Sequence, residues 1–290
     1  MNVRLPVCHV AAWVFLILPL RAAADRHEPL LTARLVAVHS VESRLTNAPP
    51  AKAWRRFSNW SAAAVQNGTL KPNPSFWAKG VDFSCASFWN TQGRNTRAGT
   101  AVSARHVVFA HHFPLAAGTT LMFFGTDGQI HHRKITASRR ISTTDLMVGV
   151  LESDLPRTVH PALILPPNWR DYLGSGAGLP VVTFDYEEKG LVMELNAPQS
   201  GRRGDVWSAR HPVDPVRAPF TERLIVGDSG NPCFLLMNED VILLYTITTG
   251  GPGGGPAIQP LRAMLQYAMD QLCPGYRLRE YDFSSYTSRP

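Results

Sequence analysis

The chain has 290 residues, and its 29 basic and 22 acidic side chains give a formal charge of +7. Residues 1–24 carry +2 of this excess, residues 25–79 carry +5, and residues 80–290 have equal numbers of basic and acidic side chains. A nucleic-acid binder is expected to carry a basic surface through its folded body. The distribution therefore argues against a nucleic-acid partner, and the apolar fraction of 44% argues against disorder of the whole chain.

Residues 1–24 predict a secretory signal peptide. Arg4 supplies a positive start, residues 10–20 form an apolar run of 11 residues, and residues 22–24 are three alanines suited to cleavage. Because a membrane span needs about 20 apolar residues, the run is too short to cross a bilayer, and a short anchor is the alternative. We expect a secreted or periplasmic protein that is not membrane-bound after signal removal.

Residues 25–79 predict an N-terminal extension or propeptide. Residues 30–41 could form a short helix, which the prolines at positions 49 and 50 would interrupt. The segment 67–74 is polar, and short strand-like runs begin only after it. Whether this basic region is retained or cleaved is left open by the sequence.

From about residue 80 the chain consists of short runs rich in β-branched and aromatic residues. Asp127 and Gly128 lie between two of these runs and predict a tight turn. Many short strands separated by turn signals indicate an all-β sandwich or barrel. The runs expected as strands are residues 100–102, 107–110, 121–124, 129–135, 146–151, 181–184, 191–195, 233–237 and 241–247.

A single helix is expected near the C-terminus. Pro260 suits the first turn of a helix, and the sequence Cys-Pro-Gly at residues 273–275 would end it. Apolar residues between these limits recur at helical spacing and share one face: Leu261, Met264, Leu265, Ala268 and Leu272. The pattern predicts one C-terminal helix on a β body.

Cysteine and histidine usage gives no sign of a metal or organic cofactor. Cys85, Cys233 and Cys273 remain after signal removal, which allows at most one internal disulfide, of open pairing. No zinc-site spacing is present, and the glycine-rich run at residues 250–256 lacks the Lys-Ser/Thr of a phosphate-binding loop. The adjacent histidines at positions 131 and 132 would point to opposite faces of a strand, as expected for a solvated strand.

Three motifs carry the candidate chemistry, in the order His, Asp, Ser. His112 follows the strand-like run at residues 107–110, Asp145 precedes another such run, and Ser229 lies in Gly-Asp-Ser-Gly. A serine hydroxyl needs an imidazole as general base, and the imidazole needs an acceptor on its other nitrogen. The motifs predict Ser229 as nucleophile, His112 as base and Asp145 as the residue that orients it.

The glycines around Ser229 also predict an oxyanion hole. Glycine permits backbone angles that direct two N–H groups, those of Gly227 and Ser229, into one spot. Such preorganised donors stabilise the oxyanion, and losing one typically costs about 3–4 kcal/mol in the barrier.

On these motifs the chain resembles the trypsin-like serine peptidases of the chymotrypsin fold, over roughly residues 80–272. The tetrapeptide 227–230 matches the family's nucleophile motif, and the order His, Asp, Ser is the family's order. The end of the predicted strand before His112 is similar to the family's small-Ala-His ending. The resemblance implies an all-β fold of two packed six-stranded Greek-key β-barrels with a cleft between them and a C-terminal helix. It places the N-terminal barrel at residues 80–165 and the C-terminal barrel and helix at residues 166–290.

The chain departs from the family pattern at several places. His111 stands where alanine is usual, so two adjacent histidines compete for the role of base, with strand-end alignment favouring His112. Phe113 and Ile225 replace cysteines, and Asn231 replaces a glycine. No Ile-Val-Gly-Gly-like activation site begins the domain, although in animal members a freed N-terminus pairs with the residue that matches Asp228. The partner of Asp228 is therefore an open question.

The resemblance also indicates where substrate would bind. The stretch Thr248, Thr249 and Gly250 matches the family strand that binds substrate backbone, and Arg223 occupies the pocket-floor position. Arg223 at the floor would select an acidic substrate side chain, because a buried unpaired arginine is costly. A surface arginine in a loop of different length is the alternative.

Two functions follow from this pattern. The first is a secreted, monomeric serine endopeptidase that cleaves protein or peptide substrates through an acyl-enzyme, without metal or cofactor. The second is a catalytically silent relative that acts as a secreted binding protein. An α/β-hydrolase would need its histidine after the serine, and no histidine follows His211. The subtilisin order is not excluded by motif order, but the α/β alternation of that fold is not seen.

Overall fold

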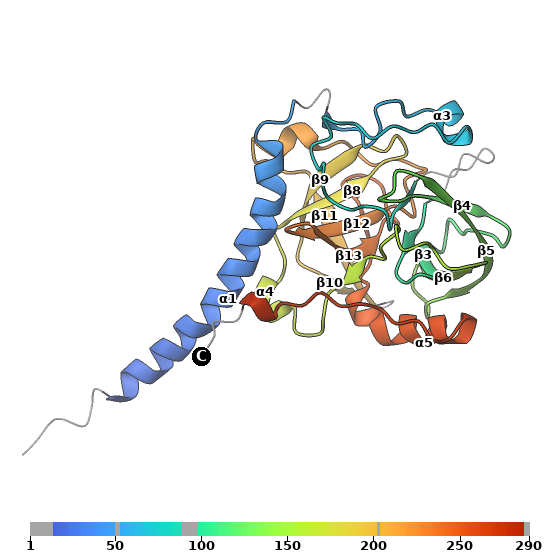
Figure 1. Ribbon diagram of the computed structural model, residues 1–290. Helices are drawn as coiled ribbons and strands as arrows, with labels where there is room; N and C mark the ends of the chain where they lie inside the picture. The colour runs from blue at the N-terminus through green and yellow to red at the C-terminus, as the bar shows by residue number, and fades with distance from the viewer. Residues whose placement is uncertain (1–13, 50–52, 89–97, 202–203, 287–290) are drawn as a thin grey trace, which may run out of the picture.

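The computed structural model describes residues 14–49, 53–88, 98–201 and 204–286. This part of the chain is predominantly β, with two sheets, a long N-terminal helix on one side and a helix near the C-terminus below them (Figure 1). The helices are α1 (Val14–Leu45), α3 (Ala62–Gln66), α4 (Arg170–Leu173) and α5 (Arg262–Leu272), with 3₁₀ turns η1 (Ala218–Phe220), η2 (Gln259–Leu261) and η3 (Ser284–Tyr286).

The first sheet is a nearly closed six-stranded antiparallel barrel. Its strands lie in the order β1-β4-β5-β6-β3-β2. The edge strands approach each other, because Ser87 N–H donates to Gly99 O at 2.9 Å and Ala101 N–H donates to Cys85 O at 2.8 Å. The strands are β1 (Ser87–Phe88), β2 (Thr100–Ala101), β3 (His106–Ala110), β4 (Thr120–Phe124), β5 (Ile130–Arg140) and β6 (Leu146–Leu151).

The second sheet has eight strands. Seven lie in the order β10-β11-β9-β8-β12-β13-β7, and β14 pairs with β11. An isolated bridge between Tyr245 and Ala257 links the residue after β14 to β13, and β7 runs parallel to β13. The strands are β7 (Leu163–Ile164), β8 (Pro180–Phe184), β9 (Gly190–Leu195), β10 (Gln199–Gly201), β11 (Gly204–Arg210), β12 (Pro232–Met237), β13 (Asp240–Thr246) and β14 (Gly254–Pro256).

The nine strands expected from the sequence all occur, with shifts of one or two residues at most ends. The exception is β5, which continues to Arg140 through polar residues that its partner β6 holds by backbone hydrogen bonds. The predicted turn at Asp127 and Gly128 joins β4 to β5, with Gly128 at a φ of +75°. The strands not anticipated are mostly pieces of two or three residues, too short for a periodic pattern, together with the half-polar β11.

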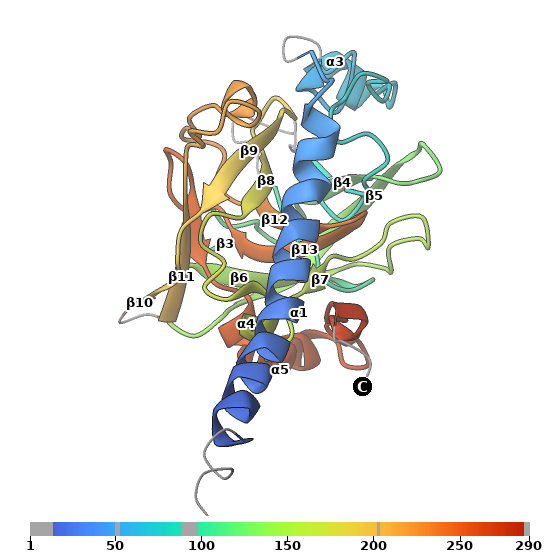
Figure 2. The ribbon, with the colours of Figure 1, turned by 90° about the vertical axis from the view of Figure 1, so that its left-hand side faces the viewer.

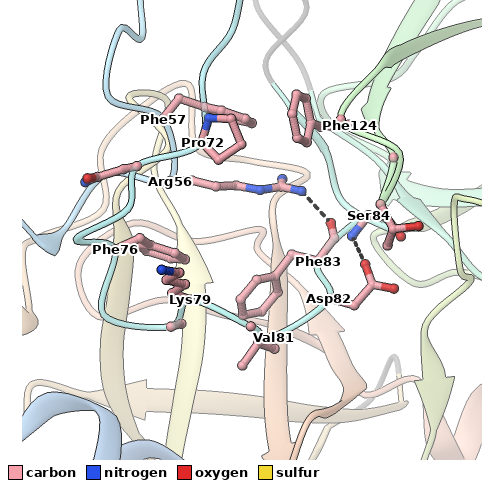
Figure 3. Close-up of a pocket in the computed structure, with 16 residues that line it drawn as sticks. Arg56, Phe57, Pro72, Phe76, Lys79, Val81, Asp82, Phe83, Ser84 and Phe124 are labelled. Atoms are coloured by element: carbon pink, nitrogen blue, oxygen red, sulfur yellow. Dashed lines mark hydrogen bonds between the residues drawn. The ribbon is translucent and has the colours of Figure 1, made fainter.

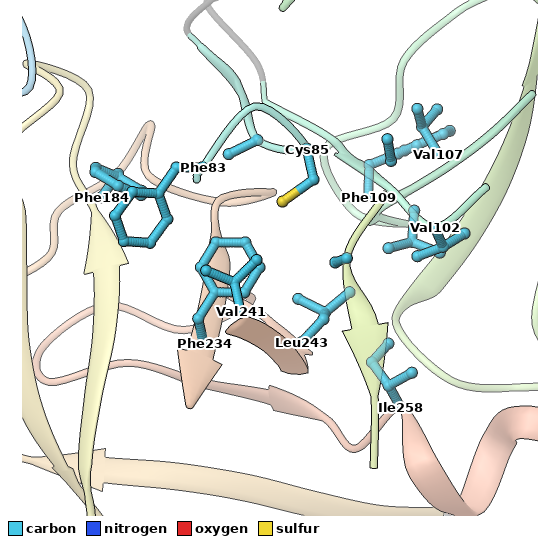
Figure 4. Close-up of a cluster of buried hydrophobic side chains, with 14 of the residues drawn as sticks. Phe83, Cys85, Val102, Val107, Phe109, Phe184, Phe234, Val241, Leu243 and Ile258 are labelled. Carbon is cyan, nitrogen blue, oxygen red and sulfur yellow. The ribbon is translucent and has the colours of Figure 1, made fainter. Parts of the chain in front are cut away.

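The main hydrophobic core joins the two sheets. Figure 4 shows Phe109 of β3 on one side and Phe83, Phe184 of β8 and Phe234 of β12 on the other, with Cys85 between them. All five side chains are buried, and the rings of Phe83 and Phe184 meet edge to face at 5.0 Å. The two sheets therefore pack as one body, and the segment before β1 is part of their shared core.

The N-terminal helix packs on the second sheet. Figure 2 shows α1 in front of β12 and β13. Ala33, Ala37, Val41 and Leu45 recur every fourth residue and are buried, so one face of the helix docks on the body. The buried guanidinium of Arg217 donates to a carboxylate oxygen of α1, that of Glu42, at 2.6 Å. The predicted helix at residues 30–41 is thus part of a longer one.

Residues 53–79, expected to belong to an extension, also pack into the β body. Phe57 and Val65 are buried with Phe88 of β1 and Met122 of β4. Of the predicted signal segment, residues 1–13 lie outside the described residues, and residues 14–24 form the start of α1. Within the described chain, no helix combines the length and the apolar character needed to cross a membrane.

The expected C-terminal helix occurs as η2 followed by α5. Leu265 and Ala268 are buried on its inner face, whereas Met264, predicted on the same face, is 43% exposed. The three described cysteines are separate thiols, with Cys85 and Cys233 buried and Cys273 partly exposed. Burial raises the pKa of the Cys233 thiol to about 12, so it behaves as a neutral core side chain.

Candidate active site

The structure brings His112, Asp145 and Ser229 into one hydrogen-bonded row. His112 Nδ1 lies 2.7 Å from Asp145 Oδ2, and His112 Nε2 lies 2.9 Å from Ser229 Oγ. The backbone N–H of His112 donates to the other carboxylate oxygen, Asp145 Oδ1, at 2.8 Å. The His112 side chain is 45% exposed, so a substrate can reach the imidazole and the hydroxyl beside it.

Strand pairing places the histidine beside the aspartate. Strands β3 and β6 are antiparallel with Ala110 opposite Leu146, so the residues just after β3 meet the residue just before β6. His111 N–H donates to Asp145 O at 3.1 Å, which extends the ladder by one step. Residues 111–113 form a bend after β3, and one of the two adjacent histidines has a described side-chain hydrogen bond to the carboxylate. That residue is His112.

The serine comes from the other sheet. Ser229 lies in the turn before β12, and Gly230 N–H donates to Ile247 O at 2.9 Å, just after β13. The triad row thus crosses from the first sheet to the second. Neither sheet alone contains the full set of groups.

The turn around Ser229 contains two glycines with positive φ. Gly227 has a φ of +114° and Gly230 a φ of +99°, both in the region that favours glycine. Within the described residues, the N–H groups of Gly227 and Ser229 have no backbone hydrogen-bond acceptor. Both groups are therefore available to an oxygen atom bound next to Ser229.

We expect Gly230→Ala to lower the free energy of unfolding by about 3 kcal/mol or more. A Cβ at residue 230 would stand 2.5 Å from Ala98 O, and the residue would keep an unfavourable φ. Gly128→Ala is the matched control, because Gly128 also has positive φ but open space around its Cβ position. Urea unfolding should show a smaller loss in the free energy of unfolding for Gly128→Ala than for Gly230→Ala. Equal losses would contradict the inference that residue 230 has no room for a Cβ atom.

Asp228, next to Ser229, is buried and bound by two backbone N–H groups. Tyr186 N–H donates to Oδ1 at 2.9 Å, and Ile225 N–H donates to Oδ2 at 2.7 Å. Burial raises the pKa of Asp228, while the two N–H donors and the nearby charge of Lys189 lower it in part. The partner that the sequence left open is thus found within the chain. Backbone N–H donors have no residue signature, so no sequence pattern could have identified Tyr186.

The predicted substrate segment lies beside the serine turn. The N–H groups of Thr248 and Thr249 donate to Gly254 O at 2.8 and 3.3 Å, and Gly250 is exposed. Leu224 is buried and exchanges backbone hydrogen bonds with Gly251 at 2.7 and 2.9 Å. The structure places the neighbouring Arg223 in an exposed position.

A cavity of about 330 Å³ lies elsewhere, and its walls contain none of the triad residues. Figure 3 shows it between the N-terminal segment and residues 81–84, with the Arg56 guanidinium directed at Phe83 O. His131 of β5 lies 3.1 Å from Asp127. Across the described chain, no group of three His, Cys, Asp or Glu side chains could hold a metal ion.

Comparison with known proteins assigns no family to the chain. No protein-family model matches it, and no curated protein matches its sequence.

Proposed function

We propose that the chain is a serine endopeptidase that cleaves peptide bonds through an acyl-enzyme. The single observation that carries the proposal is the placement of His112, with one ring nitrogen at Asp145 and the other at Ser229. This arrangement supplies a nucleophile, a base and an orienting acceptor in hydrogen-bond reach. The substrate is a protein or peptide, and the enzyme acts as an exported monomer.

In the acylation step Ser229 Oγ attacks the substrate carbonyl carbon, and its proton moves to His112 Nε2. Asp145 accepts the Nδ1–H of His112, which holds the ring in the tautomer that leaves Nε2 free to accept. The C–N bond then breaks, and the imidazolium returns the proton to the leaving amine. Water repeats the sequence on the ester and releases the acid.

The charge that develops on the carbonyl oxygen is held by the N–H groups of Gly227 and Ser229. Both donors are backbone groups of a glycine-rich turn, so no side chain has to move to bind the oxyanion. Preorganised donors of this kind usually make the largest single contribution to lowering the activation barrier. The exposed Gly250, with Thr248 and Thr249, would pair with the extended substrate backbone.

The fold that goes with this function is a pair of Greek-key barrels of the chymotrypsin type, in the trypsin-like family. The nearly closed first barrel is compatible with it. In the second sheet, the bridge between Tyr245 and Ala257 joins β13 to the residue after β14. These two strands are not neighbours in the strand order, so the bridge supports closure of this sheet into a second barrel. The triad then lies between the two barrels.

The test is labelling with a fluorophosphonate, which transfers its phosphonyl group to the oxygen of an activated serine and releases fluoride. The wild-type protein should be labelled on Ser229, and Ser229→Ala should not be labelled, since the nucleophilic oxygen is absent. In-gel fluorescence and peptide mapping give the readout. Equal labelling of both proteins, or none of either, would contradict the proposal and favour a secreted binding protein.

A further inference from the structure

We propose that residues 53–57 and Trp77, here named the N-terminal clamp, position Asp228 and through it the oxyanion donors by holding the turn at residues 185–189. The inference rests on the proposed function and extends it. It makes the clamp, which lies in the region predicted as a propeptide, a permanent part of the active enzyme. No freed N-terminus is then needed to assemble the site.

The first step concerns Asp228 itself. This residue lies between Gly227 and Ser229, so the direction of its carboxylate sets the orientation of both peptide units that offer the oxyanion donors. Asp228 is 1% exposed, and its carboxylate accepts one N–H on each oxygen, from Tyr186 and from Ile225. Ile225 belongs to the same loop as Asp228, so Tyr186 is the anchor that comes from elsewhere.

The second step concerns the turn that carries Tyr186, between β8 and β9. Asp185 Oδ1 accepts the N–H groups of Glu187 and Lys189, each at 2.9 Å. Burial raises the pKa of Asp185 to about 6, with the nearby Asp228 adding to the rise. Glu188 is buried at a φ of +57°, which is unfavourable for a residue with a side chain. Two buried carboxylates and a strained residue make this turn dependent on outside support.

The third step is the backbone of the clamp, which supplies that support. Arg56 N–H donates to Glu188 O at 2.8 Å, and Gly190 N–H donates to Trp54 O at 2.8 Å. The two hydrogen bonds flank an antiparallel bridge between Arg55 and Lys189. The clamp therefore pairs with the turn as a short added strand.

Clamp side chains reinforce the pairing. Trp77 Nε1–H donates to Gly190 O at 2.7 Å in a buried position, and Trp77 N–H donates to Ala53 O at 2.9 Å. Arg55 forms an ion pair with Glu187 at 2.8 Å. These contacts tie one end of the clamp to the other and to the turn.

Arg56 is the charged centre of the clamp. Its guanidinium lies 3.7 Å from the Glu188 carboxylate and donates to Phe83 O at 3.1 Å (Figure 3). Its side chain is about nine-tenths buried, so loss of the segment would leave Glu188 buried without this cation. Removal of the clamp would therefore disturb the turn, and with it the N–H that holds Asp228.

Trp77→Phe tests the clamp, since it removes the N–H donor to Gly190 O together with part of the indole ring. We expect about a tenfold loss in kcat and in the rate of fluorophosphonate labelling, because a buried carbonyl loses its partner. KM should stay unchanged, since the clamp touches none of the substrate residues. Assays run well below the Tm of each variant, so that a loss of global stability does not lower the signal.

Trp60→Phe is the matched control. Trp60 lies in the same region and stacks on Phe57, but makes no described contact with the turn. It should keep wild-type kcat and labelling rate. Equal kcat in Trp77→Phe and wild type would overturn the clamp, whereas absence of labelling in wild type would overturn the proposed function instead.

A second measurement does not depend on how the variants fold. The exported protein is labelled with the fluorophosphonate and its native mass is determined. We expect every labelled molecule to retain residues 53–77. A labelled, active protein that has lost these residues would overturn the proposal.

Discussion

His112→Ala is expected to lower kcat by about a millionfold, whereas His111→Ala should change kcat by no more than a few-fold. Removing the His112 ring takes away the group that lies 2.9 Å from Ser229 Oγ, so the hydroxyl has no base. The His111 side chain has no described hydrogen bond, and the backbone N–H that it gives to Asp145 O survives the substitution. Steady-state hydrolysis of a peptide substrate measures both effects.

The pair of variants also serves as its own control for folding. Both remove one imidazole from adjacent, solvent-accessible positions, so their Tm values should be similar. A large loss of kcat in His111→Ala with activity retained in His112→Ala would reverse the assignment of the base. Full activity in both would mean that neither histidine takes the serine proton.

Asp145→Asn should lower kcat by about ten-thousandfold with little change in stability. The Asp145 carboxylate lies 2.7 Å from His112 Nδ1 and accepts its proton. The amide of an asparagine can instead donate its NH₂ group to His112 Nδ1. Nδ1 must then accept with a lone pair, so the ring carries its proton on Nε2. A ring in this tautomer has no lone pair to receive the proton of Ser229.

Asp127→Asn is the control for that prediction. Asp127 also pairs with a histidine of the first sheet, His131, at 3.1 Å, but lies outside the triad. Its substitution should leave kcat unchanged when the same peptide substrate is used. If Asp145→Asn keeps wild-type kcat, the orienting role of Asp145 is wrong.

Local patterns in the sequence determined much of the strand content. Most of the nine expected strands are rich in apolar, β-branched or aromatic residues and are buried in the two sheets, whereas β5 is largely polar and mostly not buried. Strands of two or three residues have no periodicity to detect, and the polar end of β5 is held by its neighbour. The structure of these short strands and of the end of β5 is set by pairing with neighbouring strands, and no local sequence pattern contains this information.

The residue types and their order also singled out His112, Asp145 and Ser229, because the chemistry needs those side chains. The choice between two adjacent histidines depends on which one the ladder of β3 and β6 turns toward the carboxylate. This orientation is a property of the paired strands. The order of residues alone leaves His111 and His112 as alternatives for the base.

The packing of the N-terminal region is seen only in the tertiary structure. Its basic excess separates it from the neutral body in the sequence, and this is why it was expected to be an extension or propeptide. In the structure Arg56 is buried against Glu188, and Trp77 donates to Gly190 O. Asp228 in turn is held by the backbone N–H of Tyr186. A main-chain donor is the same in every residue except proline, so only the folded chain can show which one reaches a buried carboxylate.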